Sequence, residues 1–122
     1  MNNNKTLMIT GGTGSLGKAA IKFFLKQKQW KKIIVFSRDE LKQSQLKKKF
    51  TSNKLRFFIG DVRDYGRLLI ATKKVDCIIH AAALKQVDTA EYNPTEFIET
   101  NIIGAKNIIE VCSRNRIKKV IA

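Results

Sequence analysis

Short apolar runs alternate with amphipathic segments along the whole chain. Each run is too short for a helix and long enough for a buried strand, and the runs cover residues 7–9, 32–36, 55–59, 75–79 and 117–122. The runs are apolar on both faces, which is typical of a parallel sheet covered by helices on both sides. The pattern therefore predicts an α/β fold, a Rossmann-like doubly wound parallel sheet in the order 3-2-1-4-5.

A glycine-rich turn, residues 10–17 (TGGTGSLG), joins the first run to the first helical segment. That helix is predicted from an apolar stripe at helical spacing: Leu16, Ala19, Ala20, Phe23 and Phe24. Between a strand and a helix, such a turn favours dinucleotide binding over a purely structural turn. Gly11 would allow the tight turn, Gly14 the approach of a pyrophosphate, and Gly17 the packing of helix on strand. The amides and positive dipole end of the helix would hold the phosphates.

Three later helices carry start signals. Asp39 and Asp64 are predicted N-caps of the second and third helices. Asn93 precedes Pro94 and Glu96, the order expected of an N-cap, a first helical proline and a capping-box glutamate. The fourth helix is therefore expected to begin at Pro94.

The length and composition fit one small domain, and we expect residues 1–122 to be the N-terminal part of a dinucleotide-binding domain whose remainder and substrate lobe are absent. A hydrophobic fraction of 43% and a single proline argue against disorder. The net charge of +14 comes from 24 Lys and Arg against 10 Asp and Glu, a balance that nucleic-acid binders also have. The basic residues are spread out and fall mostly at predicted helix ends, so we favour a solvated surface and expect no nucleic-acid partner.

Neither Cys77 nor Cys112 belongs to a metal-binding motif, so we expect buried, reduced thiols and no metal. No signal peptide is visible in these residues, and no apolar run approaches the ~18 residues that span a bilayer. We expect a cytoplasmic protein without a membrane segment. Residues 120–122 stop inside an apolar run, which suggests truncation within strand five and a longer parent protein.

Candidate binding residues follow the second strand. Sites for NAD usually place a carboxylate there, whereas this chain has Ser37 and Arg38 first. A guanidinium matches a 2′-phosphate, so these residues favour NADP over NAD. In the alternative interpretation, Asp39 and Glu40 are only first-turn acids and Arg38 is solvated.

The third and fourth strands end in further candidates, each with a structural alternative. Asp61 either accepts a hydrogen bond from the adenine amino group or closes a turn. Residues 81–83 form either a wall without bulky side chains, against which the cofactor lies, or an ordinary close-packed strand end. His80 is interpreted as a core residue rather than a catalyst. Lys85 would face an anionic substrate, and Asn101 either bonds the fourth strand or faces solvent.

These motifs resemble the extended short-chain dehydrogenase/reductases. The TGxxGxxG turn is joined by residues 37–43 (SRDELKQ), 60–64 (GDVRD), 81–87 (AAALKQV) and 91–94 (EYNP). Together they are similar to the inverting UDP-N-acetylglucosamine 4,6-dehydratases of bacterial surface-sugar biosynthesis, over essentially the whole chain. The resemblance implies NADP, a UDP-sugar substrate and a homo-oligomeric enzyme.

The resemblance also implies a reaction and a set of cofactor contacts. Hydride passes from C4 of the sugar to NADP+, water leaves from C6, hydride returns there, and C5 is inverted. Lys85 would touch cofactor or substrate, and Thr100 and Asn101 would support the site. The implied cofactor-binding residues are Gly11, Thr13, Gly14, Ser15, Leu16, Ser37, Arg38, Asp39, Glu40, Leu41, Lys42, Asp61, Val62, Ala81, Ala82, Lys85, Thr100 and Asn101.

The chain departs from the family in its catalytic residues. The Tyr-xxx-Lys pair is absent, because Leu69 stands four residues after Tyr65 and Glu96 four after Tyr92. No catalytic residue is assigned, and we expect these 122 residues to be inactive alone. The alternatives are a related nucleotide-sugar epimerase or retaining dehydratase, and a non-catalytic NADP-binding module.

Overall fold

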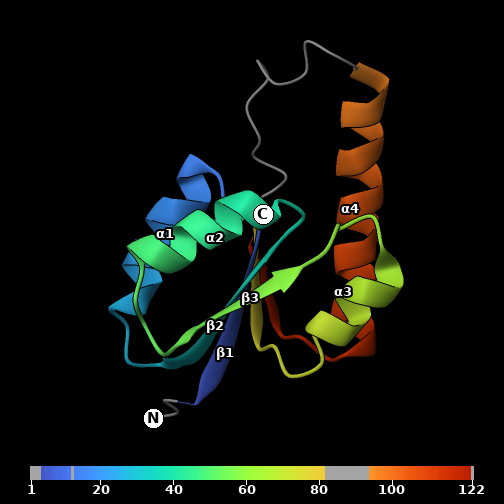
Figure 1. Cartoon of the computed structure of the whole chain (residues 1–122). Coiled ribbons are helices and arrows are strands. Elements are labelled where there is room, and N and C mark those ends of the chain that lie inside the picture. The colour runs from blue at the N-terminus through green and yellow to red at the C-terminus, as the bar shows by residue number, and fades with distance from the viewer. Residues whose placement is uncertain (1–3, 12, 82–93, 122) are drawn as a thin grey trace.

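The computed structural model describes residues 4–11, 13–81 and 94–121, with side chains from residue 102 onward in the last range. Helices and strands alternate as the hydrophobic pattern predicts (Figure 1). In chain order they are β1 (Lys5–Thr10), α1 (Ser15–Leu25), β2 (Trp30–Ser37), α2 (Glu40–Lys49), β3 (Leu55–Ile59), α3 (Tyr65–Ala71), β4 (Cys77–His80), α4 (Pro94–Arg114) and β5 (Lys119–Ile121).

The five strands form one parallel sheet in the order β3-β2-β1-β4-β5, which confirms the predicted topology. Leu7 of β1 pairs with Ile33 of β2 on one side and with Cys77 of β4 on the other. The strand order changes direction at β1, so the carboxyl ends of β1 and β4 flank the switch point where doubly wound sheets bind ligands.

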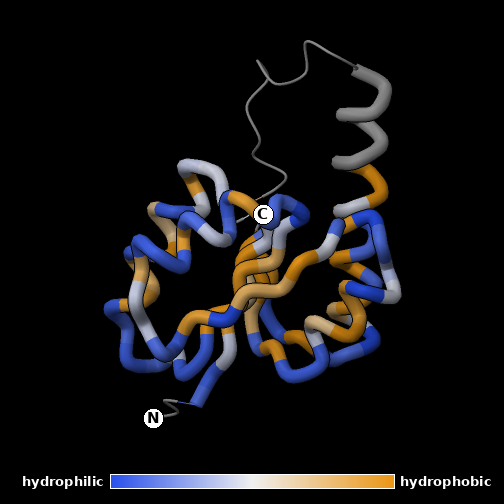
Figure 2. Tube along the Cα trace, in the orientation of Figure 1, coloured by the Kyte–Doolittle hydropathy of each residue, from blue (hydrophilic) through white to orange (hydrophobic). Residues whose placement is uncertain are grey.

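Helices cover both faces of the sheet, with α1 and α2 on one side and α3 and α4 on the other (Figure 1). Alternate strand residues point to opposite faces. Leu7 and Ile9 therefore pack in one cluster with Ile21 of α1, and Met8 packs in the other with Val111 of α4. Apolar residues gather along the central strands and the helix faces beside them (Figure 2).

The predicted apolar face of α1 is wrong by about one residue. Leu16 and Phe23 are 50% and 60% exposed, whereas Gly17 and Ile21 are buried against the sheet. Ala20 and Phe24 are partly buried at the edge of the contact. Two overlapping stripes have helical spacing here, and the one that packs contains a glycine that carries no apolar side chain.

The predicted helix starts are confirmed. The Asp39 carboxylate accepts from the backbone N–H of Lys42 at 3.0 Å, and Asp64 accepts from that of Arg67 at 3.1 Å. Helix α4 begins at Pro94, while its expected N-cap Asn93 lies outside the described residues. Among the helices described, none is long and apolar enough to cross a membrane.

Candidate functional site

The turn after β1 brings the start of α1 to the carboxyl edge of the sheet. Gly11 has a φ of 67°, a conformation that favours glycine, and its N–H donates to the Phe36 carbonyl of β2 at 2.9 Å. The N–H of Gly14 then donates back to the Gly11 carbonyl at 3.3 Å. The turn therefore needs glycine at position 11, as predicted.

The N-terminus of α1 is open to an anion. Gly14 is the N-cap and makes no side-chain capping bond, and the first turn contains no acidic residue. A Cβ at Gly14 would meet only the Gly11 carbonyl oxygen, at 3.8 Å, so the space beside it is not filled by described parts of the protein. Ser15 and Leu16 are exposed on the same turn. Unpaired helix amides and the dipole leave this end positive, which suits phosphate.

The end of β2 is fixed by a residue that sequence reasoning missed. The buried Gln43 side chain donates from Nε2 to the Ser37 Oγ at 3.0 Å, to the Ser37 carbonyl at 3.2 Å and to the Phe58 carbonyl at 3.2 Å. Gln43 thereby ties α2 to the ends of β2 and β3. Gln43 and Leu46 are three residues apart and share the buried face of α2, and this spacing was the available signal. A search for apolar residues at helical spacing passes over it, because glutamine is polar.

The other candidates after β2 lie at the surface. Arg38 has 49% of its side chain exposed, and Leu41 is 69% exposed. Glu40 and Lys42 are also exposed, while Asp39 is half-buried and caps α2. The structure therefore places the whole segment around the edge where the cofactor is expected, with Arg38 directed towards β3.

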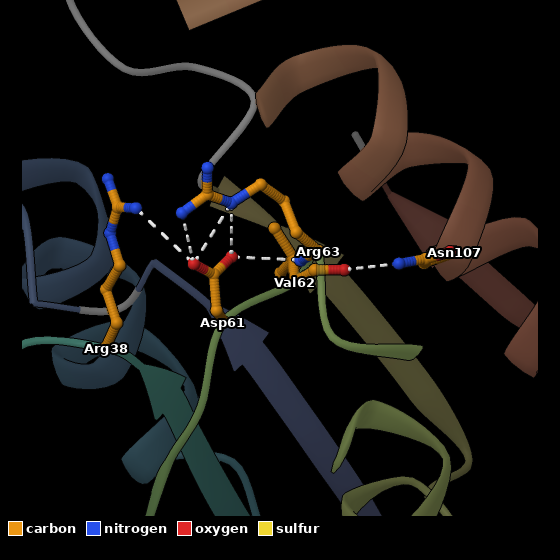
Figure 3. A network of polar contacts seen from close by, with 5 residues as sticks. All are labelled: Arg38, Asp61, Val62, Arg63 and Asn107. Carbon is orange, nitrogen blue, oxygen red and sulfur yellow. Dashed lines mark hydrogen bonds and ion pairs between the residues drawn. The ribbon is translucent and has the colours of Figure 1, made fainter. Parts of the chain in front are cut away.

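Asp61, after β3, is the centre of a charged network (Figure 3). Its carboxylate lies 3.4 Å from Arg38 Nη1 and 2.7 Å from Arg63 Nη2. Burial raises the pKa of Asp61, but hydrogen bonds from Arg63 and the charges of Arg63 and Arg38 lower it more, so the pKa lies below its ordinary value. Asp61 also closes the turn, because Oδ1 accepts from the N–H of Arg63 at 2.9 Å and its carbonyl from that of Asp64 at 2.9 Å. The proposed turn role is thus present.

Helix α4 holds the neighbouring Val62. The buried Asn107 donates from Nδ2 to the Val62 carbonyl at 2.9 Å, across 45 residues of sequence (Figure 3). A Cβ at Gly104 would lie 2.7 Å from Val62 Cγ2, so α4 approaches this segment too closely for any larger residue. Asn107 was not predicted; the sequence hypothesis chose Asn101, whose side chain lies outside the described residues.

The end of β4 contains a structural histidine. His80 is 4% exposed, its Nδ1 lies 2.6 Å from the Thr10 Oγ1 of β1, and burial lowers its pKa. This confirms the interpretation of His80 as a core residue. Ala81 is buried beside it.

Apart from Thr13, the remaining candidates lie partly or wholly beyond the described residues. Ala82 and Lys85 fall outside them, and only the backbone of Thr100 is described. Thr13 is buried in the turn before α1. Within the described parts of the chain, no group of three or more His, Cys, Asp or Glu side chains is placed to hold a metal ion.

Known proteins share both this sequence and this architecture. The chain is 55% identical over 122 residues to a UDP-N-acetylglucosamine 4,6-dehydratase (inverting) of Campylobacter jejuni, and 50% identical over 121 residues to a UDP-glucose 4-epimerase of Rickettsia bellii. These alignments cover 100% and 97% of this chain. The chain spans 36% of the length of either relative.

Solved structures of other proteins have a similar fold. The X-ray structure of Pen from Bacillus thuringiensis matches with a TM-score of 0.87 and 39% identity, over 98% of this chain and 36% of that one. DesIV of Streptomyces venezuelae, a dTDP-glucose 4,6-dehydratase with NAD and TYD bound, matches with a TM-score of 0.78 and 25% identity, over 94% of this chain and 38% of that one. Proteins of this fold therefore include NAD-binding dehydratases.

A family model described as polysaccharide biosynthesis protein matches residues 7–122, which contain every element from α1 onward and most of β1. The match takes in the glycine turn, the Asp61 network and the α4 contact to Val62. The chain therefore belongs to the family of polysaccharide biosynthesis proteins.

Proposed function

We propose that this chain is the cofactor-holding part of a UDP-N-acetylglucosamine 4,6-dehydratase (inverting) that uses NADP. The observation that carries the cofactor assignment is the uncapped, acid-free N-terminus of α1 at the carboxyl edge of the sheet. The 55% identity to the Campylobacter dehydratase over the whole chain supports the substrate class. By the same resemblance, the whole protein would act on a UDP-sugar as a cytoplasmic homo-oligomer.

The bound dinucleotide would supply a reversible hydride acceptor. On this proposal residues 13–16 hold its pyrophosphate, Arg38 binds the 2′-phosphate, and Asp61 and Val62 line the adenine. Ala81, Ala82, Lys85, Thr100 and Asn101 stay predictions for the ribose and substrate end. These residues bind and orient; none of them forms the Tyr-xxx-Lys pair that would take the hydroxyl proton.

The preference for NADP is tested by titrating NADP and NAD against the wild-type protein and Arg38→Ala with isothermal calorimetry. Hydrogen bonds to charged groups contribute about 1.5–3 kcal/mol. Because the Arg38 side chain is 49% exposed, we expect the lower end, a fall of about tenfold in the NADP/NAD affinity ratio. Arg56→Ala is the matched control, because it removes the same positive charge from the N-terminal end of β3, away from the carboxyl edge of the sheet. An unchanged ratio in Arg38→Ala would remove Arg38 as the 2′-phosphate contact.

The absence of turnover is tested separately. The protein is incubated with NADP+ and UDP-N-acetylglucosamine, and the 4-keto sugar is sought by mass spectrometry. A proton-transfer group contributes about 10²–10⁴-fold, so its absence predicts background activity only. Product above that of Gly14→Asp, whose added carboxylate repels phosphate, would contradict the assignment of a binding role alone.

A second candidate, a UDP-glucose 4-epimerase, is favoured by the 50% identity to the Rickettsia protein. Both reactions require the same cofactor-binding half. The whole protein would distinguish them by product, since an epimerase returns a hydroxyl at C4 whereas a dehydratase removes water from C6.

A further inference from the structure

The acceptor positions of the Asp61 carboxylate are filled by contacts within the protein. Oδ1 accepts from Arg63 N at 2.9 Å and from Arg63 Nε at 3.2 Å. Oδ2 accepts from Arg63 Nη2 at 2.7 Å, from Arg63 Nε at 3.1 Å and from Arg38 Nη1 at 3.4 Å. Four N–H groups make these five contacts, because the single Arg63 Nε–H is shared between both oxygens, and a carboxylate offers about four lone-pair sites.

This occupancy conflicts with adenine recognition as the resemblance implies it. The exocyclic amino group of adenine is a donor and requires an unoccupied acceptor. When the weak contact from Arg38 is removed, Oδ2 still accepts from Arg63 Nη2 at 2.7 Å and from the shared Nε–H at 3.1 Å, so Arg63 remains the main competitor for this oxygen. Departure of the Arg63 guanidinium, which makes three of the five contacts, frees most of the acceptor capacity of the carboxylate.

We infer that Arg63 sets the affinity of the adenine subsite by competing with the adenine amino group for Asp61. This inference rests on the proposed nucleotide binding. When the nucleotide binds, the amino group replaces the Arg63 Nη2 and Nε donors, and the guanidinium moves away from the carboxylate. Arg63 thus satisfies the Asp61 carboxylate when no nucleotide is bound, and thereby lowers the affinity of the site for adenine nucleotides.

Two other hydrogen bonds keep the segment after β3 in place when the Arg63 side chain leaves Asp61. The backbone N–H of Arg63 keeps its 2.9 Å bond to Asp61 Oδ1 when the side chain leaves, so the carboxylate keeps its orientation. Asn107 holds the intervening Val62 carbonyl from α4. The Arg63 side chain is 34% exposed, so water can hydrate the released guanidinium, and an ion pair of this kind opposes binding only weakly.

The test compares AMP with IMP, which carry the same phosphate. IMP has a carbonyl at the purine 6-position in place of the amino donor, and its N1 carries a hydrogen. Affinities are measured calorimetrically for the wild-type protein, Arg63→Ala and Arg63→Lys. The AMP/IMP affinity ratio cancels any general loss of positive charge. We expect the ratio to rise about two- to fivefold in Arg63→Ala, the range of a partly exposed ion pair. Arg63→Lys, with a single ammonium in place of the fork of donors, should lie between the two.

Arg67→Ala is the matched control. Arg67, in α3, donates from Nε to the Ile59 carbonyl at 2.8 Å and lies over the Phe58 ring, so its removal should leave the ratio unchanged. Circular dichroism verifies that each variant is folded. A ratio that is unchanged or lower in Arg63→Ala overturns the inference, as does a selective loss of NADP over NAD binding. Absence of AMP and NADP binding in the wild-type protein would instead refute the proposed function itself.

Discussion

Replacing Asn107 with alanine removes the side-chain bond between α4 and the segment after β3. The Val62 carbonyl, in a residue only 7% exposed, then loses the donor that lies 2.9 Å away. A buried acceptor left without a partner costs about 1–3 kcal/mol. For a chain of this size that corresponds to a fall in Tm of roughly 3–5 °C per kcal/mol.

The free energy of unfolding is measured by urea titration, and AMP affinity by calorimetry on the same preparations. We expect Asn107→Ala to lose stability and also to bind AMP several-fold more weakly, because Val62 and Asp61 are adjacent. Asn115→Ala is the control: Asn115, directly after the same helix, donates to the Thr72 Oγ1 at 2.9 Å, remote from the loop. It should lose about 1–2 kcal/mol of stability while AMP affinity stays unchanged. Wild-type stability in Asn107→Ala, or equal loss of binding in both variants, would refute the reasoning.

Two further perturbations have defined outcomes. Gly104→Ala places a methyl group 2.7 Å from Val62 Cγ2 and should lower the unfolding free energy, measured by urea titration, by about 1–3 kcal/mol. Gly66→Ala should be neutral or stabilising in the same titration, because its Cβ would meet only Asp64 Oδ1, at 3.8 Å. Burial lowers the pKa of His80 from its ordinary 6.5, so at acidic pH the unfolded chain binds more protons than the folded chain. The stability that the neutral histidine contributes is therefore present above pH 6.5 and should be lost as the pH falls below that value. His80→Asn should flatten this dependence between about pH 7 and 5; a profile identical to wild type would show that His80 does not cause it.

The arrangement of the sheet could be predicted because its signals are redundant. Each apolar run is bounded by a turn or a helix cap, and the crossover rules leave few orders for five parallel strands. Asp39 and Asp64 serve as caps with local contacts, so their roles follow from nearby sequence alone. Local chemistry of this kind needs no knowledge of the tertiary fold.

The contacts that fix the site could not be predicted in this way. The packing face of α1 depends on Gly17 and Ile21, and a glycine carries no hydrophobic signal. The β2 end depends on Gln43, a polar residue buried by its three hydrogen bonds. Such residues are recognised only when the groups that they satisfy are placed in space.

The choice between two asparagines of α4 illustrates the same limit. Asn101 and Asn107 are six residues apart, which at about 100° per residue places them on different faces of the helix. The sequence shows both polar positions but not which one meets a carbonyl. Asn107 meets it because the Gly104 face is the one that approaches Val62.

The bond from Asn107 to Val62 has a consequence for the nascent chain. Strands β1 to β3 and the turn before α1 leave the ribosome well before the helix that holds Val62, since the two partners are 45 residues apart. Domains assemble as synthesis proceeds, at about 5–20 residues per second. We therefore expect the proposed nucleotide site to mature in two stages, with the glycine-rich turn before α1 formed first and the segment at Asp61 and Val62 completed only after α4 has docked.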